Sequence, residues 1–282
     1  MDKKSDFRSK KSKKIKSGFI LTYWKIFDIS MFGRDKETVL KIVEDWIESE
    51  AKSKWIATVN PEFVMKALKN DDFKSLLRET DLNVVDGIGL IWARELDRRI
   101  SVLEHKNLTK KILIGAKIGG EILLGKHKEN IVSGSDLIPD LCKLAGEKKY
   151  KVFFLGGFGD RAKRTMEHFS KYKIESRSCS GEPDFSNEEV LKKINEFKPD
   201  ILFVAYGMKK QEEWIKNNRN KANFGVAIGV GRSFDYYSGD LKRAPKIVRK
   251  MGMEWLYSLI KEPKRLKRQL ELPKFIWKVL NK

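Results

Sequence analysis

The stretch from Thr58 to Leu90 reads TVNPEFVMKALKNDDFKSLLRETDLNVVDGIGL and contains two strand–turn–helix units in succession. A short apolar run leads to Thr58 and Asn60, and the proline that follows opens a segment with apolar residues at helical spacing. A second apolar run ends on Asp86, with Gly87 directly after it. Because the ends of parallel strands meet at one edge of a sheet, these units predict a single cleft around the three polar side chains.

The same polar residues have a plainer interpretation. Asp86 would then cap the helix that follows it, and Asn60 with Pro61 would form an ordinary turn. Strands that end in an Asp-Gly turn are frequent, so the spacing alone leaves both interpretations open.

The rest of the chain continues the alternation of strands and helices. One or two opening strands are expected between residues 19 and 29, followed by an amphipathic helix over residues 35–49. From residue 132 onward, strands are expected at 151–155, 174–179, 201–206 and 224–230, and helices at 135–149, 160–172, 187–197 and 209–220. The expected fold class is therefore α/β, with a Rossmann-like, mostly parallel sheet sandwiched by helices.

Composition divides the chain into three parts. Residues 1–17 form a basic arm, rich in lysine and serine, that is expected to be disordered. Residues 18–241 form the α/β core, in which residues 97–132 interrupt the regular alternation. Residues 242–282 form a basic helical appendage, whose amphipathic helices are expected to be divided at Pro263 and Pro273.

Most of the formal net charge of +20 lies at the two ends of the chain. Residues 1–16 carry eight Lys or Arg against two Asp, and residues 242–282 carry thirteen against three Glu. Basic ends around a nearly neutral centre indicate an anionic partner, and charge alone does not separate nucleic acid from an anionic membrane. The two cysteines fit a reducing cytoplasm, and no apolar run reaches the roughly 18–20 residues of a spanning helix.

A series of short motifs resembles the WecG/TagA/CpsF family, glycosyltransferase family 26, whose members extend lipid-linked surface polysaccharide precursors. The resemblance covers residues 27–270 in the family's order. The matching motifs are Thr58-Val59-Asn60-Pro61-Glu62, Val85-Asp86-Gly87-Ile88-Gly89, Gly134-Ser135-Asp136-Leu137, Phe154-Leu155-Gly156-Gly157, Lys198-Pro199-Asp200, Gly207 with Lys210-Gln211-Glu212, Gly229-Val230-Gly231 with Phe234-Asp235, Arg243-Ala244-Pro245 and Glu254-Trp255-Leu256.

The resemblance implies an inverting, metal-independent enzyme that uses no cofactor. It would move an N-acetylhexosamine, N-acetylmannosamine first of all, from a UDP-sugar donor to a polyprenyl-diphosphate-linked saccharide in cell-surface polysaccharide or teichoic-acid-type glycan synthesis. It would act as a peripheral protein on the inner face of the cell membrane, held there by its tail, with a homo-oligomer left open. The resemblance also marks residues 97–132 as an insertion, either a packed helical hairpin or a membrane-contacting element.

The site residues follow from the same resemblance. Asp86 is the expected general base and Thr58 a second catalytic residue, with the remaining positions in contact with substrate. Those substrate-binding positions are Asn60 and Gly87 near the reacting sugars, Gly156 and Gly157 at a phosphate, Gly207, Gln211, Gly231 and Asp235 at the nucleotide, and Arg265 and Arg268 at the diphosphate. An ordinary turn at residues 156–159 and a helix cap at Gln211 are the plainer alternatives.

No Asp-x-Asp pair occurs, so arginine rather than a metal ion is expected to neutralise the leaving diphosphate. The chain departs from the family's pattern at Asn130, Lys209, Arg232 and Ser258. Ser258 stands where an arginine is expected to meet the diphosphate, and Arg232 or Arg265 is the expected replacement. A second hypothesis is a nucleic-acid-binding protein with basic terminal arms and a catalytically inert α/β core.

Overall fold

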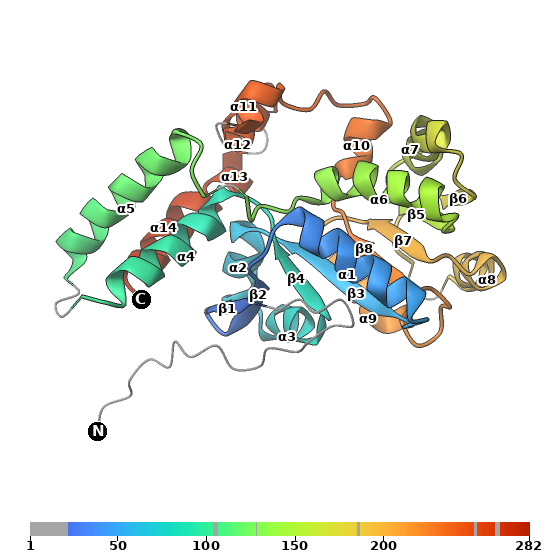
Figure 1. Cartoon of the computed structure of the whole chain (residues 1–282), viewed down its shortest axis with the longest axis horizontal. Coiled ribbons are helices and arrows are strands. Elements are labelled where there is room, and N and C mark those ends of the chain that lie inside the picture. Colours follow the sequence, from blue (N-terminus) through green and yellow to red (C-terminus); the bar gives the residue numbers. More distant parts are fainter. Residues whose placement is uncertain (1–21, 104–106, 128, 185–186, 251–252, 263–265) are drawn as a thin grey trace.

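An eight-stranded sheet with helices on both faces forms the centre of the computed structural model (Figure 1). The structure describes residues 22–103, 107–127, 129–184, 187–250, 253–262 and 266–282. The strands lie in the order β1-β2-β4-β3-β8-β7-β5-β6, and every neighbouring pair is parallel except β1 and β2. Their bounds are β1 Tyr23–Ile26, β2 Ile29–Phe32, β3 Lys54–Val59, β4 Leu82–Val85, β5 Val152–Gly156, β6 Ser176–Cys179, β7 Ile201–Ala205 and β8 Val226–Gly229.

The central strands are apolar along their whole length because both of their faces are covered. Every residue of β4, β5, β7 and β8 is buried, as is typical of a parallel sheet between two helical layers. Two apolar clusters of the described residues lie on opposite faces of this sheet. The expected α/β sandwich is therefore confirmed.

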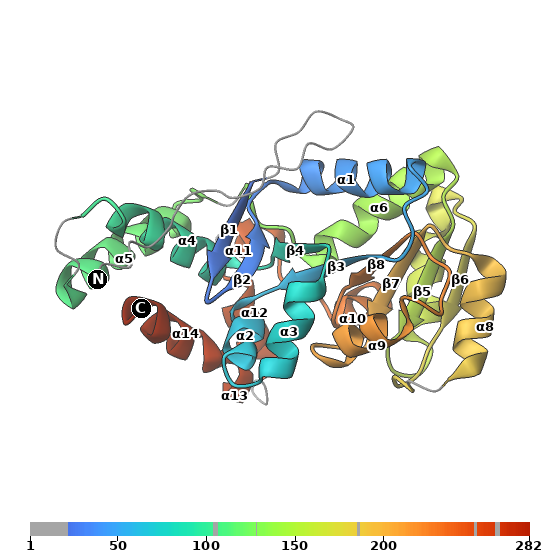
Figure 2. The same cartoon turned by 90° about the horizontal axis from the view of Figure 1, so that it is seen from below.

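Helices from different parts of the chain make up the two layers (Figures 1 and 2). One layer contains α1 Lys36–Glu48, α6 Gly134–Lys148, α7 Arg161–Phe169 and α10 Ser233–Tyr237. The other contains α2 Pro61–Ala67, α3 Asp71–Glu79, α4 Ile88–Ile100, α5 Leu108–Leu123, α8 Glu188–Phe197, α9 Lys210–Asn218 and α14 Glu271–Leu280. A short 3₁₀ turn, Ser170–Tyr172, follows α7.

The segment 97–132 begins inside a helix, because α4 continues to Ile100. The next helix, α5, packs along α4, and the indole N–H of Trp92 donates to the carbonyl of Gly115 at 2.8 Å. A Cβ atom at position 115 would lie 2.8 Å from the Trp92 ring, so only glycine allows this approach. One face of α5 therefore packs against the core, as one of the two expectations for this segment requires, while a membrane contact stays a prediction.

The C-terminal segment is helical as expected, and its described residues form four helices. These are α11 Lys246–Lys250, α12 Glu254–Lys261, α13 Leu266–Gln269 and α14. The expected division at Pro273 is wrong, since this proline lies in the first turn of α14, where its missing N–H costs no helical hydrogen bond. Phe275 and Val279 of α14 are buried in the main core, so the last helix returns to the sheet domain.

Some expectations fall on residues outside those described. They are the disorder of residues 1–17, the division at Pro263 and the role of Arg265. None of the described helices combines the length and the apolar composition that crossing a bilayer requires.

Candidate active site

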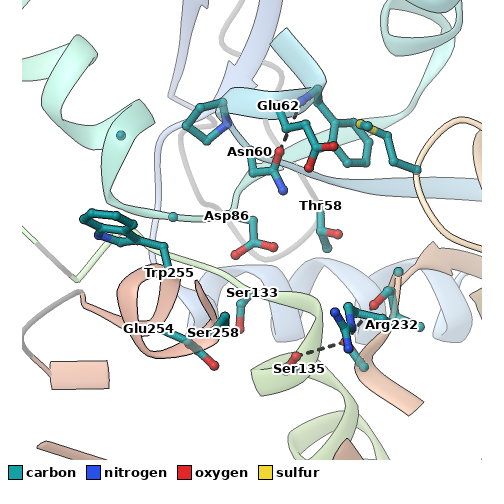
Figure 3. Close-up of a pocket in the computed structure, with 18 of the residues that line it drawn as sticks. Thr58, Asn60, Glu62, Asp86, Ser133, Ser135, Arg232, Glu254, Trp255 and Ser258 are labelled. Atoms are coloured by element: carbon teal, nitrogen blue, oxygen red, sulfur yellow. Dashed lines mark hydrogen bonds between the residues drawn. The ribbon is translucent and has the colours of Figure 1, made fainter. Parts of the chain in front are cut away.

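A cavity of about 410 Å³ opens at the carboxyl ends of the central strands (Figure 3). Its floor is formed by the residues that follow β3, β4, β7 and β8, and the N-terminus of α6 forms one side. The tail contributes α12, whose Glu254, Trp255 and Ser258 line the cavity beside the N-terminus of α6 (Figure 3). This is the position in which an open α/β sheet binds ligands.

Thr58 and Asn60 are fixed at the end of β3. The Thr58 hydroxyl donates to the carbonyl of Gly229 at 2.8 Å, which ties β3 to β8 just below the cavity. The Asn60 Oδ1 atom accepts from the N–H of Phe63 at 3.1 Å and so caps α2. The oxygen of this amide is thus committed, and Figure 3 shows its nitrogen turned toward Asp86 and Thr58.

Asp86 extends from the end of β4 into the middle of the cavity (Figure 3). Its backbone N–H donates to the carbonyl of Val59 at 2.7 Å, which fixes its position beside β3. The next residue, Gly87, has φ of +102° and caps α4 without any side-chain hydrogen bond. Among the described residues, none donates a hydrogen bond to the Asp86 carboxylate, so the interpretation of this residue as a helix cap is wrong.

The surroundings of Asp86 favour its protonated form. Burial above all, and then the carboxylates of Glu254 and Asp136, raise the pKa of Asp86 to about 7 against the opposing charge of Arg243. A carboxyl group whose pKa lies near neutral pH can accept a proton and release it again, as a general base must.

A charged network joins the tail to the core at the wall of the cavity. Arg243 donates from Nη1 to Asp136 Oδ1 at 2.7 Å and from Nε to Glu254 Oε1 at 3.2 Å. Although burial raises the pKa of Asp136, the hydrogen bond from Arg243 holds that pKa below its ordinary value. No role was predicted for Arg243 or Glu254, although both lie in motifs that carry the family resemblance.

Three further arginines line the cavity, Arg232, Arg249 and Arg268, and each is held by a carboxylate. Arg232 donates to Asp235 and to Glu262, both at 3.1 Å. Arg268 forms a two-pronged pair with Glu62, at 2.9 and 2.8 Å. Arg232 therefore lies at the cavity, where it was expected to replace a missing arginine, and Arg268 lies there as expected.

The expected nucleotide contacts divide into two groups. Gly207 and Gly231 line the cavity, both with positive φ. Gln211 borders it but is fully shielded from solvent, and its Oε1 accepts from the N–H of Gly231 at 2.9 Å. Asp235 does not line the cavity and instead holds Arg232 and Arg161. Gln211 and Asp235 thus support residues that face the ligand space, and Gln211 does not cap its helix.

Gln211 is supported in turn by a buried acid. Its Nε2 donates to Glu212 Oε1 at 2.8 Å, and the N–H of Lys209 donates to Glu212 Oε2 at 2.8 Å. Burial raises the pKa of Glu212 to about 7 against the effect of these hydrogen bonds. A Cβ atom at position 229 would lie 2.5 Å from the Gln211 amide, so Gly229 provides the space for this arrangement.

Gly156 and Gly157 lie at the end of β5 and are not among the residues that line the cavity. The N–H of Gly157 donates to the carbonyl of Ala205 at 3.1 Å and is therefore already occupied. The structure gives this turn the plainer role of a strand–helix connection. Among the described residues, no three His, Cys, Asp or Glu side chains converge on a point where a metal ion could bind.

Comparison with known proteins identifies relatives over most of the chain. A sequence model described as "Glycosyl transferase WecG/TagA/CpsF family" matches residues 24–107 and 114–282. A protein of Bacillus spizizenii strain W23 is 31% identical over 233 residues, which is 81% of this chain and 79% of the relative. Two Staphylococcus aureus proteins, from strains MRSA252 and MW2, are 30% and 29% identical over 89% of this chain and 91% of their own. All three are named N-acetylglucosaminyldiphosphoundecaprenol N-acetyl-beta-D-mannosaminyltransferase.

Proposed function

The chain belongs to the WecG/TagA/CpsF family of glycosyltransferases, and on this premise we propose its donor, its acceptor and the residues that react. The donor is a UDP-linked N-acetylhexosamine, and N-acetylmannosamine is the first choice because the relatives are named as transferases of this sugar. The acceptor is a sugar linked to polyprenyl diphosphate. The observation that carries the proposal is the position of Asp86, a carboxylate of raised pKa in the centre of a cavity at the strand ends.

The reaction is a single displacement. The acceptor hydroxyl loses its proton to Asp86 as its oxygen bonds to the anomeric carbon of the donor sugar. The bond from that carbon to the diphosphate breaks, and UDP leaves with the electron pair, so the configuration inverts. Thr58 and the free amide nitrogen of Asn60 lie beside Asp86 and would orient the two sugars (Figure 3).

The two ends of the cavity differ in chemistry, which suggests the direction in which the substrates lie. Arg232 lies at one end and Trp255 at the other, with Asp86 between them (Figure 3). We assign the diphosphate of the donor to the arginine end, because guanidinium groups bind phosphate oxygens in pairs and can neutralise the leaving group without a metal ion. The lipid-linked acceptor then enters past Trp255, whose ring is 37% exposed.

The composition of the tail supports action at the surface of a membrane. Its exposed apolar side chains, Ile247, Ile260, Leu266, Leu270 and Trp277, lie on a segment of strongly positive charge. Basic helices with exposed apolar and aromatic side chains lie in the interface of anionic bilayers. We propose that the tail holds the enzyme on the inner face of the cell membrane, with residues 1–17 as a separate basic arm. Membership of a glycosyltransferase family removes the reason for the alternative of an inert core that binds nucleic acid.

The test is a transfer assay with purified full-length protein, a panel of UDP-sugars and a polyprenyl-diphosphate-linked N-acetylglucosamine acceptor. We expect UDP release and a product of inverted configuration with UDP-N-acetylmannosamine, at the same rate with EDTA as with Mg²⁺. Release with a different UDP-sugar would change the donor, whereas loss of activity in EDTA that Mg²⁺ restores would contradict metal independence. Absence of release with the whole panel would contradict the proposal.

A further inference from the structure

The outer face of α5 is free of charged side chains over its whole length. At helical spacing it presents the exposed residues Thr109, Ile112, Leu113, Ala116, Gly120, Leu123 and Leu124. Leu113 is 65% exposed, Leu123 53% and Leu124 82%. The opposite face, with Gly115, Ile118 and Ile122, is buried against the core. This helix therefore has two apolar faces, and only one of them packs against other described residues of the protein.

The charges of α5 are arranged around this outer face. Lys110 and Lys117 are exposed along one border of it, at a separation of two helical turns. The one acid of the helix, Glu121, lies one turn after Lys117 and is largely covered, because it accepts hydrogen bonds from Arg99 and His127. These bonds hold the pKa of Glu121 at about 2, so it stays a paired anion. The outer face is thus apolar with a basic border and carries no exposed acid.

We infer that this outer face of α5 is a docking surface for an anionic lipid bilayer, separate from the C-terminal tail. An apolar stripe with lysine at its border is the pattern of a helix that lies in the headgroup region, with its apolar side chains inserted and its lysines near lipid phosphates. A bilayer rather than a protein is favoured because the basic border matches an anionic surface. The inference also rests on the proposed function, in which the acceptor is held in a membrane.

The position of α5 fits this role. It packs with α4 and α14 at the end of the molecule far from β6 (Figures 1 and 2). The ammonium group of Lys111 donates to the carbonyl of Leu280 at 2.9 Å, which links α5 directly to the last tail helix. Residues 108–113, at the start of α5, are the part of residues 24–282 that the family model leaves unmatched. The surface therefore adjoins the tail but lies on a segment where this chain differs from the family's pattern.

The test measures binding of the full-length protein to vesicles of phosphatidylcholine with phosphatidylglycerol, by co-sedimentation. Leu113→Glu should weaken the partition coefficient about tenfold or more, since it removes an inserted leucine and adds an anion. The control is Phe158→Glu, a side chain with the same 65% exposure in the turn after β5, which should bind as wild type does. Leu113→Gln, which adds no charge, should lie between them, and thermal melting checks that each variant folds.

Lysine variants and lipid-free samples separate the other outcomes. Lys110→Gln with Lys117→Gln should weaken binding to the anionic vesicles severalfold and leave binding to pure phosphatidylcholine unchanged. Equal binding by Leu113→Glu and wild type would overturn the inference. If, in addition, Leu113→Glu dissociated an oligomer in lipid-free solution, a second copy of the chain would be the occupant.

Failure of this inference and failure of the proposed function give different results. Transfer to a short-chain, water-soluble acceptor should proceed at the wild-type rate in Leu113→Glu, because α5 contributes no residue to the cavity. If wild type transferred no sugar to any acceptor, the proposed function would fail while the vesicle comparison still decided the role of α5.

Discussion

The two sides of the cavity are built in different ways. The floor is fixed by the sheet, through the backbone hydrogen bond of Asp86 to Val59 and the bond of Thr58 to Gly229. The side formed by the tail is held to the core by charged side chains, chiefly Arg243 between Asp136 and Glu254. The floor can therefore place a reacting group rigidly, whereas the position of the tail side depends on salt and on the state of its carboxylates.

The tail side is attached more weakly than the floor because its ion pairs are partly exposed to solvent. A partly exposed ion pair contributes only about 0–1 kcal/mol, so the Arg243–Asp136 pair, whose carboxylate is 40% exposed, and the pairs of Arg232 and Arg268 hold the tail weakly compared with the packed sheet. The last helix differs from the rest of the tail, because Phe275 is fully buried in the main core. The tail is thus anchored at its far end and loosely held beside the cavity, an arrangement suited to admitting a bulky substrate.

The largest expected effect comes from the floor. Asp86→Asn keeps the shape of the side chain but removes the base, so kcat should fall by about 10²–10⁴-fold while the affinity for the nucleotide stays near wild type. Steady-state transfer kinetics and a nucleotide-binding titration measure the two quantities.

The matched control for this substitution is Asp71→Asn, at an exposed aspartate in the first turn of α3. It makes the same chemical change away from the cavity and should turn over at the wild-type rate. Wild-type turnover in Asp86→Asn would mean that the base lies elsewhere, with Glu254 of the tail the next carboxylate to test.

The second prediction concerns the anchor of the tail. Phe275→Ala should lower the free energy of unfolding by about 3–5 kcal/mol, because it leaves a cavity in the core. Trp277→Ala, two residues away and 60% exposed, should change the free energy of unfolding by about 0.5 kcal/mol or less. Urea denaturation measures both, and equal effects would show that α14 does not pack on the core in solution.

The sequence predicted the floor of the site better than the tail side. Thr58, Asn60 and Asp86 could be brought together from the sequence because parallel strands end at one edge of the sheet. Gln211 could not be placed in this way, since its burial depends on a glycine eighteen residues later that leaves room for its amide. Contacts of this kind join distant segments and leave no local pattern.

The tail shows a second limit of the sequence. An amphipathic helix such as α14 looks the same whether its apolar face meets lipid or a protein core, so the pattern did not reveal that Phe275 is buried. Its proline was misinterpreted for a related reason, because a first-turn proline and a helix-ending proline differ only in where the helix begins. Arg243, Asp136 and Glu254 were visible in their motifs, but the pairing of Arg243 with Asp136 of the core and Glu254 of the tail required the structure.

The smallest expected effect is the one that connects the two sides. Because Asp86 must be deprotonated to accept a proton and its pKa is about 7, kcat/KM should fall about tenfold for each pH unit below 7. The carboxylate of Glu254 raises that pKa, so Glu254→Gln should shift the acidic side of the pH–rate profile, its acidic limb, to lower pH. The ratio of the rate at pH 6 to the rate at pH 8 should then increase, by less than about tenfold. Glu262→Gln removes the same charge from the same tail, but Glu262 is not among the groups that shift the pKa of Asp86, so its limb should stay in place. If both variants kept the wild-type limb, the tail side would not be close enough to Asp86 in solution to influence its pKa. A shift of the limb in Glu254→Gln alone would show that the loosely held tail side sets the ionisation of Asp86 on the rigid floor.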